Sequence, residues 1–427
     1  MNALSQILQQ NKQGLGTGIY SVCSAQPLVL RAALRRAKAD GSVLLIEATA
    51  NQVNQFGGYT GMLPADFIAY VQQLAKQEGL AQQQLMFGGD HLGPVVWCKE
   101  PAEQAMQKAE QLIAVFVQAG FSKIHLDTSM ACADDPAVLS DEVIANRAAR
   151  LCKVAEQHRK PDQQLCYVIG TEVPAPGGVT ELEHELAPTP VQAVLHTLNT
   201  HKAAFAAAAL ADEVWQKVIA VVVQPGVEFD NSKVHLFDAP AAQSLTDFIQ
   251  RQQGLVYEAH STDYQLPEHL QALVQGHFAI LKVGPGLTFA LREALFALSF
   301  IEDELVAVAQ SSQLRQRCKA LMQDKPAYWQ KFYTDTEQGW QLLYSFSDRL
   351  RYYWPEAALQ QATETLFSNL SKPLPLPLLS QFLPAGYQAV LRGSVPNNAK
   401  DLVIHHIDQV LATYAKACAL AATSRSR

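Results

Sequence analysis

The 427-residue sequence has no long apolar run: no stretch of about 18 apolar residues, the length that crosses a bilayer as a helix, occurs in it. Residues 1–14 are polar and rich in glutamine, so the apolar segment of a signal peptide is also missing. Charged residues are scarce, at 17%, whereas hydrophobic residues reach 48%. Because disordered chains combine low hydrophobicity with high net charge, this composition predicts a folded protein with a large core.

Positive charge is in short supply. The chain has 33 Lys and Arg residues against 40 Asp and Glu residues, a net charge of −7, which gives no general attraction to nucleic acid or to an anionic membrane. A local pocket can still bind a small anion. The seven cysteines are scattered and none forms a CxxC pair, which argues against a zinc knuckle and a disulfide framework. We therefore expect reduced thiols, a cytoplasmic location, and no nucleic-acid or membrane partner.

Nucleotide-binding motifs are missing as well. The sequence contains no GxxxxGK[ST] loop and no set of kinase motifs. The glycine-rich stretch Gly14–Gly18 precedes the first expected strand instead of following one, so it lacks the context of a dinucleotide-binding turn.

The sequence does contain an alternation of short apolar runs and helical patterns. Met106, Ala109, Leu112 and Phe116, for example, form one apolar stripe that ends before Gly120. Continuous apolar runs suit parallel strands buried on both faces, and eight of them within about 250 residues are typical of a (β/α)8 TIM barrel. We predict this α/β fold, with a doubly wound open sheet as the alternative. The eight runs are Gly18–Cys23, Val43–Ala48, Leu85–Asp90, Lys123–Asp127, Leu165–Glu172, Ile219–Gln224, Leu255–His260 and Ile280–Val283.

Beyond residue 304 the pattern becomes helical. We expect helices over Leu305–Met322, Thr336–Tyr353 and Ala399–Ala421, with Pro373–Pro377 as a stiff connector. The predicted organisation is a barrel over residues 1–304 and a helical extension over residues 305–427 that packs on it.

Polar side chains stand at or near the carboxyl ends of the expected strands. In a barrel these ends meet at one mouth, where enzymes of this fold place their sites. Glu47 and Asp127 either belong to such a site or cap neighbouring backbone. His125 and Asp127 are two residues apart and share a strand face, so a structural pair inside the barrel is also possible. The strand-end set is Glu47, Asp90, His91, His125, Asp127, Glu172, Gln224, Glu258, His260 and Lys282.

Two of these histidines suggest a metal site. Imidazole nitrogens and carboxylate oxygens suit a divalent cation, zinc in particular. His91 and His260 end the third and seventh strands, and with Glu172 or Asp90 they would leave a further position open. A metal there would polarise a sugar carbonyl or enolate oxygen.

The loops after strands seven and eight suggest a phosphate site, because barrels commonly bind phosphate there. The hydroxyls of Ser261 and Thr262, the backbone at Gly284 and the helix start near Thr288 would hold the anion. A plain Gly-Pro-Gly turn explains the same residues equally well. Lys282 is either a partner of the carboxylates or a phosphate contact.

Several long strings, spread from about residue 5 to residue 417, carry a family resemblance. They are Gly18–Ala25, Ile46–Thr49, Gln55–Met62, Gly88–Pro94, Lys123–Asp127, Val168–Pro174, Val223–Phe229, Glu258–Gln265, Ile280–Pro285, Ser347–Arg349 and Arg351–Pro355. In these strings the chain resembles the GatZ/KbaZ family, the Z subunits of D-tagatose-1,6-bisphosphate aldolase.

The resemblance implies a barrel related to class II aldolases and a partner, the smaller catalytic Y subunit. Class II aldolases hold a metal with three histidines, the first of which follows an Asp. Asp90-His91 and His260 match this pattern, and Glu172 matches an acid near the metal. The middle histidine is missing, because Gln224 stands in its place, and its neutral oxygen is a weaker zinc ligand than imidazole.

Two functions follow from the resemblance. The first is a non-catalytic subunit that supports the stability and full activity of the Y subunit in the breakdown of galactitol or N-acetylgalactosamine. The second is a metal-dependent D-tagatose 6-phosphate 4-epimerase acting by retro-aldol and aldol steps, which leaves open whether the chain is itself an enzyme. In either case we expect an oligomer that binds a small sugar phosphate and a zinc or manganese ion.

The expected site residues combine the strand-end residues with this resemblance. The acids expected in catalysis are Asp90, Asp127 and Glu172. The residues expected to bind substrate or phosphate are Gln224, Ser261, Thr262, Lys282 and Gly284. The expected metal ligands are His91, Glu172 and His260.

Overall fold

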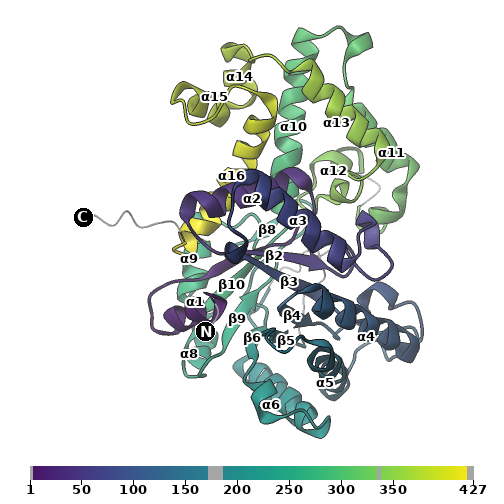
Figure 1. Ribbon diagram of the computed structural model, residues 1–427, viewed down its shortest axis with the longest axis vertical. Coiled ribbons are helices and arrows are strands. Elements are labelled where there is room, and N and C mark those ends of the chain that lie inside the picture. Colours follow the sequence, from purple (N-terminus) through teal and green to yellow (C-terminus); the bar gives the residue numbers. More distant parts are fainter. Residues whose placement is uncertain (1–2, 172–185, 334–337, 421–427) are drawn as a thin grey trace.

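A closed barrel of parallel strands forms the centre of the computed structural model, which describes residues 3–171, 186–333 and 338–420 (Figure 1). The strands follow one another around the ring in the order β1-β10-β9-β6-β5-β4-β3-β2. Their bounds are β1 (Ile19–Val22), β2 (Leu44–Thr49), β3 (Leu85–Leu92), β4 (Lys123–Leu126), β5 (Cys166–Ile169), β6 (Val218–Val222), β9 (Val256–Ala259) and β10 (Phe278–Val283). The predicted TIM barrel and its eight strands are confirmed, and the open-sheet alternative is wrong.

The strands are apolar because both of their faces are covered. All residues of β1, β4, β5, β9 and β10 are buried, so a polar residue within these strands needs a partner inside the protein. A short antiparallel ribbon, β7 (Glu228–Phe229) with β8 (Val234–His235), follows β6.

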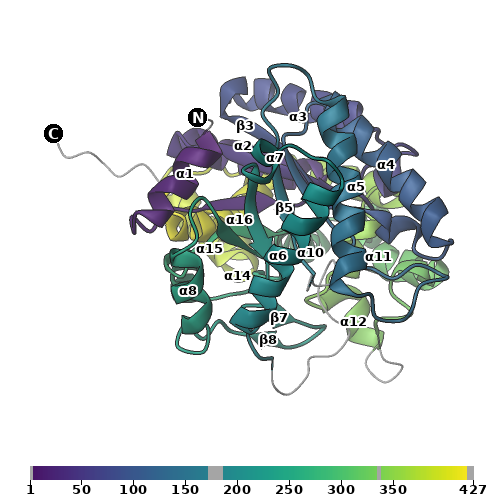
Figure 2. The same cartoon turned by 90° about the horizontal axis from the view of Figure 1, so that it is seen from below.

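Helices surround the barrel, as Figure 2 shows from below. The helix α4 illustrates why: its predicted apolar stripe, including Met106, Ala109, Leu112 and Phe116, is buried, and the helix ends at Gly120 in a left-handed conformation (φ 118°). The helices up to residue 305 are α1 (Ala3–Lys12), α2 (Pro27–Asp40), α3 (Pro64–Glu78), α4 (Ala102–Ala119), α5 (Asp141–His158), α6 (Val191–Ala207), α7 (Asp212–Trp215), α8 (Gln243–Gln250), α9 (Pro267–Gln275) and α10 (Pro285–Leu305).

The C-terminal region is helical, as predicted, but its helices differ from the expected ranges. A helix does not begin at Leu305, because α10 ends there. Among the described residues of the second expected range, 338–353, residues 338–344 form a helix and residues 349–352 a 3-10 turn. The helices are α11 (Leu314–Asp324), α12 (Gln338–Tyr344), α13 (Ala357–Asn369), α14 (Leu376–Phe382), α15 (Pro384–Leu391) and α16 (Ala399–Ala417), with the 3-10 turn η6 (Arg349–Tyr352). No helix in the described part of the chain is long and apolar enough to span a membrane.

The last helix, α16, returns to the barrel and lies against α2, α9 and β1 (Figure 1). The backbone N–H of Gly18 donates to the Cys418 carbonyl at 3.0 Å, and the Tyr414 hydroxyl donates to the Thr262 carbonyl at 2.7 Å. Arg36 forms an ion pair with Asp408. The C-terminal helix therefore completes the ring of helices between α9 and α2. The division of the chain at residue 304 stays a prediction.

Candidate active site at the barrel mouth

Four buried charged side chains form an interior ion-pair network: Glu47, Lys123, Glu258 and Lys282. The Lys123 Nζ atom lies 2.6 Å from a carboxylate oxygen of Glu47 and 2.6 Å from one of Glu258, and Lys123 is fully buried. Lys282 contacts Glu47 directly and lies 3.8 Å from Glu258. Lys282 is therefore a partner of carboxylates in this structure, which is one of the two alternatives expected for it. Among the described residues, Glu47 pairs with lysines and does not cap the backbone.

A glycine makes room for this network. The strand register places Glu47 of β2 beside Gly88 of β3, and Gly88 beside Lys123 of β4. A Cβ atom on Gly88 would lie 2.7 Å from a carboxylate oxygen of Glu47, so only glycine lets the carboxylate and the lysine meet across the middle strand.

The network keeps Glu258 and Lys123 charged despite burial. Burial alone would raise the pKa of Glu258, but Lys123 and Lys282 hold it well below the usual value. Burial would likewise lower the pKa of Lys123, and the two glutamates outweigh this effect. Lys282 also lies 2.9 Å from Asp90. Three carboxylates, of Glu47, Asp90 and Glu258, thus share two lysines, which leaves one negative charge in excess.

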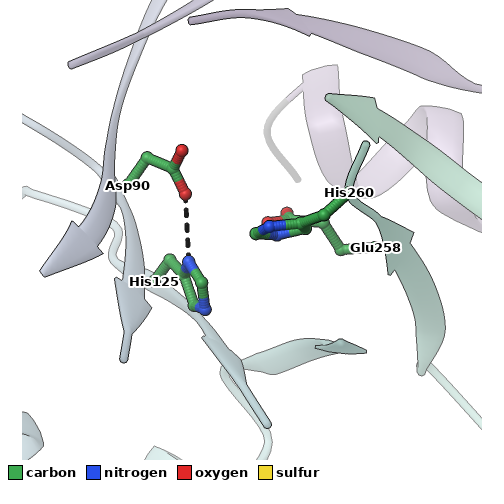
Figure 3. A group of neighbouring side chains, drawn as sticks. All are labelled: Asp90, His125, Glu258 and His260. Carbon is green, nitrogen blue, oxygen red and sulfur yellow. Dashed lines mark hydrogen bonds and ion pairs between the residues drawn. The ribbon is translucent and has the colours of Figure 1, made fainter. Parts of the chain in front are cut away.

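Glu258 also belongs to a second group of buried side chains, the mouth cluster. This cluster consists of two acids and two histidines, Asp90, His125, Glu258 and His260 (Figure 3). The His125 Nδ1 atom is 3.0 Å from Asp90 Oδ1, and the His260 Nε2 atom is 3.0 Å from Glu258 Oε1. One ligand atom of each residue lies within 4.8 Å of the others, and all four residues are buried. Burial lowers the pKa of His260 to about 4, so its imidazole is neutral near pH 7, which is the form that binds metals.

The mouth cluster fits a divalent cation. Two imidazoles and two carboxylates are a donor set that zinc and manganese accept. The His125 Nε2 atom is buried and has no hydrogen-bond partner among the described residues, and the excess negative charge calls for a cation. The cluster includes the expected ligand His260. The expected ligand Glu172 lies outside the described residues, and the identity of the metal stays a prediction.

His91, the other expected ligand, is paired with Asp127. Its Nδ1 atom lies 2.7 Å from Asp127 Oδ2, and the second Asp127 oxygen accepts from the backbone N–H and the hydroxyl of Ser129. Burial would lower the pKa of His91, but Asp90 and Asp127 raise it, which favours the charged imidazolium. His91 has a left-handed backbone (φ 48°), uncommon for a residue with a side chain and frequent at functional sites.

The groups expected to bind phosphate already have partners within the protein. The Asp263 carboxylate accepts from the backbone N–H of Gly284 at 3.0 Å and of Gly286 at 2.7 Å, so it occupies the amides at the start of α10. The Thr262 hydroxyl donates to the Lys282 carbonyl at 2.6 Å. Ser261 lines the cavity at the mouth. A phosphate role for these residues stays a prediction.

Gln224, for which the family resemblance implied the position of a metal-binding histidine, hydrogen-bonds to the backbone of its own loop. Its side-chain oxygen accepts from the backbone N–H groups of Gly226 at 2.8 Å and Val227 at 2.9 Å. The amide oxygen is thus used to shape the turn after β6.

The mouth opens into an inner cavity of about 80 Å³, lined by Asp90, His91, His260 and Lys282 and, from the C-terminal helices, by Arg351 and Tyr352. A larger cavity of about 790 Å³ adjoins it between the barrel and those helices, and the two share lining residues such as Cys23, Tyr59 and Arg351.

Sequence reasoning gave no role to Lys123 or Arg351, and it placed Glu258 among the strand-end residues without a specific role. Lys123 had a signal, a charge inside an apolar strand and on the same face as His125 two residues later. Arg351 had none beyond its place in one of the strings that carry the family resemblance.

Comparison with known proteins agrees with this architecture. Residues 4–419 match the family model described as D-tagatose-1,6-bisphosphate aldolase subunit GatZ/KbaZ-like. A crystal structure described as a probable tagatose 6 phosphate kinase from Sinorhizobium meliloti 1021 is 45% identical, with a TM-score of 0.87, over 94% of this chain and 100% of that one.

Two aldolase structures are more distant. The YdjI aldolase from Escherichia coli K12 is 10% identical (TM-score 0.43, 84% of this chain and 95% of that one). A fructose-bisphosphate aldolase from Campylobacter jejuni is 14% identical (TM-score 0.47, 86% and 94%). On the match over nearly its whole length, the chain belongs to the GatZ/KbaZ-like family of D-tagatose-1,6-bisphosphate aldolase subunits.

Proposed function

We propose that this chain is a non-catalytic subunit of a class II D-tagatose-1,6-bisphosphate aldolase. It supports the stability and full activity of a smaller catalytic Y subunit in the breakdown of galactitol or N-acetylgalactosamine, in an oligomeric assembly in the cytoplasm. The family match over residues 4–419 supports the assembly role. The non-catalytic part is supported by Gln224, whose side-chain oxygen accepts from Gly226 and Val227. The family resemblance implies a metal-binding imidazole at this position.

A second function is favoured by a different observation, the mouth cluster. A subunit that only stabilises a partner has no need of two histidines and two carboxylates buried together, of which Asp90 and His260 line a cavity. We propose as the alternative a metal-dependent D-tagatose 6-phosphate 4-epimerase, which forms D-fructose 6-phosphate. In both proposals the barrel mouth binds a tagatose phosphate.

In the epimerase, the mouth cluster would hold zinc or manganese. The bound metal would supply Lewis acidity at the carbonyl end of the ketose. The C4 hydroxyl loses its proton as the C3–C4 bond breaks, and the same oxygen regains a proton when the bond re-forms on the other face of the aldehyde. The reaction therefore needs no other reactant.

The described residues divide this work. Charged His91, oriented by Asp127, lines the cavity and stabilises negative charge that develops on the substrate oxygens. Asp90 also lines the cavity. Asp90 or Glu172, the latter outside the described residues, would transfer the C4 proton.

One pair of assays tests both proposals. A proton NMR time course follows D-tagatose 6-phosphate with the purified chain and zinc, manganese or EDTA, and an aldolase assay follows the Y subunit with and without the chain. Metal-dependent formation of D-fructose 6-phosphate supports the epimerase. Stimulation of the Y subunit without any epimerisation supports the subunit role.

A matched variant separates the two activities. His260→Ala should abolish epimerisation and leave support of the Y subunit intact, because His260 is buried at the mouth, away from any outer surface. A chain that neither epimerises the sugar nor raises the activity of the Y subunit contradicts both proposals.

A further inference from the structure

The C-terminal helices bring one arginine into the mouth of the barrel. Arg351 lies in the 3-10 turn η6 and lines both the inner cavity, with His91, His260 and Lys282, and the larger adjoining cavity. The barrel alone therefore does not complete the cavity.

Arg351 is held by neutral groups. Its Nη1 atom donates to the backbone carbonyls of Ser347 and Asp348, the latter at 3.2 Å, and its Nη2 atom donates to the Tyr352 hydroxyl at 2.9 Å. The guanidinium also lies over the Tyr352 ring, 4.4 Å from its centre. No carboxylate of the described residues lies within ion-pair distance of it. The guanidinium is thus fixed in place, with its charge still available to an anion.

The lysines and backbone amides at the mouth already have partners within the protein. Lys282 pairs with Glu47 and Asp90, and Lys123 is fully buried between two glutamates. The amides of Gly284 and Gly286 are occupied by the Asp263 carboxylate. A second anion placed there would be repelled by that carboxylate.

We propose that Arg351 binds the phosphate group of the phosphorylated ketose and so determines that the mouth accepts sugar phosphates in preference to free sugars. The inference rests on the proposed function, in which the mouth binds a tagatose phosphate. A guanidinium presents paired N–H donors that match phosphate oxygens, and its anchoring by backbone carbonyls lowers the entropy lost on binding. The C-terminal extension then supplies a specificity determinant that the barrel strands lack.

Isothermal titration of the full chain with D-tagatose 6-phosphate and with D-tagatose tests this assignment. We expect the wild-type chain to bind the phosphorylated sugar at least about 10-fold more tightly than the free sugar. Arg351→Gln should reduce this preference to within about twofold by weakening binding of the phosphorylated sugar alone. Arg392→Gln removes an equal charge from an exposed position of the same extension and should leave the preference unchanged.

If Arg351→Gln does not fold, a second variant tests whether Arg351 binds the phosphate group. Arg351→Lys keeps the charge but loses the paired donors, so it should bind D-tagatose 6-phosphate about 10-fold more weakly and D-tagatose equally well.

The outcomes separate this inference from the proposed function. A wild-type preference for the phosphorylated sugar that persists in the Arg351 variants overturns the inference and leaves the proposed ligand class standing. A wild-type chain without any such preference overturns the proposed ligand class, and the inference with it.

Discussion

The interior ion-pair network and the mouth cluster meet at Glu258, which belongs to both, yet their other side chains are paired to different degrees. In the network, Lys123 lies 2.6 Å from each of two glutamates. In the mouth cluster, His125 keeps a buried ring nitrogen without a partner in the described part of the chain, and His260 faces a cavity. Paired charges hold a barrel interior in one arrangement, whereas unpaired donors beside a cavity are available to a ligand. We therefore assign the network to structure and the cluster to function.

The largest expected effect comes from breaking the network. Lys123→Met leaves Glu47 and Glu258 with Lys282 as their shared cation, and removing one partner of a buried ion pair typically costs about 3–5 kcal/mol. Urea unfolding followed by circular dichroism measures the loss. Lys372→Met, at an exposed position, should change the free energy of unfolding by less than about 0.5 kcal/mol. A loss below about 1 kcal/mol for Lys123→Met would contradict a structural role of the network.

Glu228 sharpens the comparison, because it is a buried carboxylate without a cation among the described residues. Burial raises its pKa from 4.5 to about 7, so the unfolded chain loses this proton at lower pH than the folded chain does. The contribution to stability is complete below about pH 4.5 and is lost as the pH rises to about 7. The loss amounts to about 3 kcal/mol at about 1.36 kcal/mol per pKa unit.

Glu228→Gln should remove this pH dependence and make the protein more stable than wild type at pH 8. Thermal unfolding midpoints at pH 5 and pH 8 measure it, with Glu268→Gln, at an exposed position, as the control. The prediction fails if Glu228→Gln and the wild type lose equal stability between the two pH values.

A third prediction concerns which imidazoles hold the metal. His125 belongs to the mouth cluster, whereas His91 is paired with Asp127. His125→Ala should therefore weaken binding of zinc or manganese by about 10- to 100-fold, and by more than His91→Ala does, because the cluster contains a ring nitrogen of His125 and none of His91. Isothermal titration with each metal measures both. A larger loss of metal affinity in His91→Ala than in His125→Ala would instead support the ligand set that the family resemblance implies, with His91 as a ligand.

The smallest effect tests the link between the extension and the mouth. The Tyr414 hydroxyl of α16 donates to the Thr262 carbonyl in the loop after β9, so Tyr414→Phe should cost about 1 kcal/mol of stability. Urea unfolding measures this loss, with Tyr344→Phe, at an exposed position, as the control. Equal stability of Tyr414→Phe and wild type would mean that the hydrogen bond does not hold the two parts together.

The barrel was predictable because each strand carries its own signal. The run Val218–Val222, for example, is apolar along its whole length, which suits a strand covered on both faces. The polar residues at the strand ends could then be placed at one mouth by topology alone, and Asp90, His91 and His260 do meet there.

Pairings between strands were beyond the sequence. Glu47 meets Lys123 because the register of β2, β3 and β4 puts Gly88 between them. The amino-acid sequence alone does not give the register of neighbouring strands. The sequence also did not show that the backbone N–H of Gly284 donates to the carboxylate of Asp263, 21 residues earlier in the chain, and is therefore not free to bind phosphate. Arg351 reaches the mouth through the packing of the whole C-terminal region, which no local pattern describes.

The central claim is that the mouth cluster is a metal site. Crystals of the chain grown with zinc, with diffraction measured on both sides of the zinc absorption edge, test it most directly. The account predicts an anomalous peak within bonding distance of His125 and His260, with Asp90 or Glu258 completing the set. A peak bound by His91 without His125, or no peak at the mouth, would contradict it.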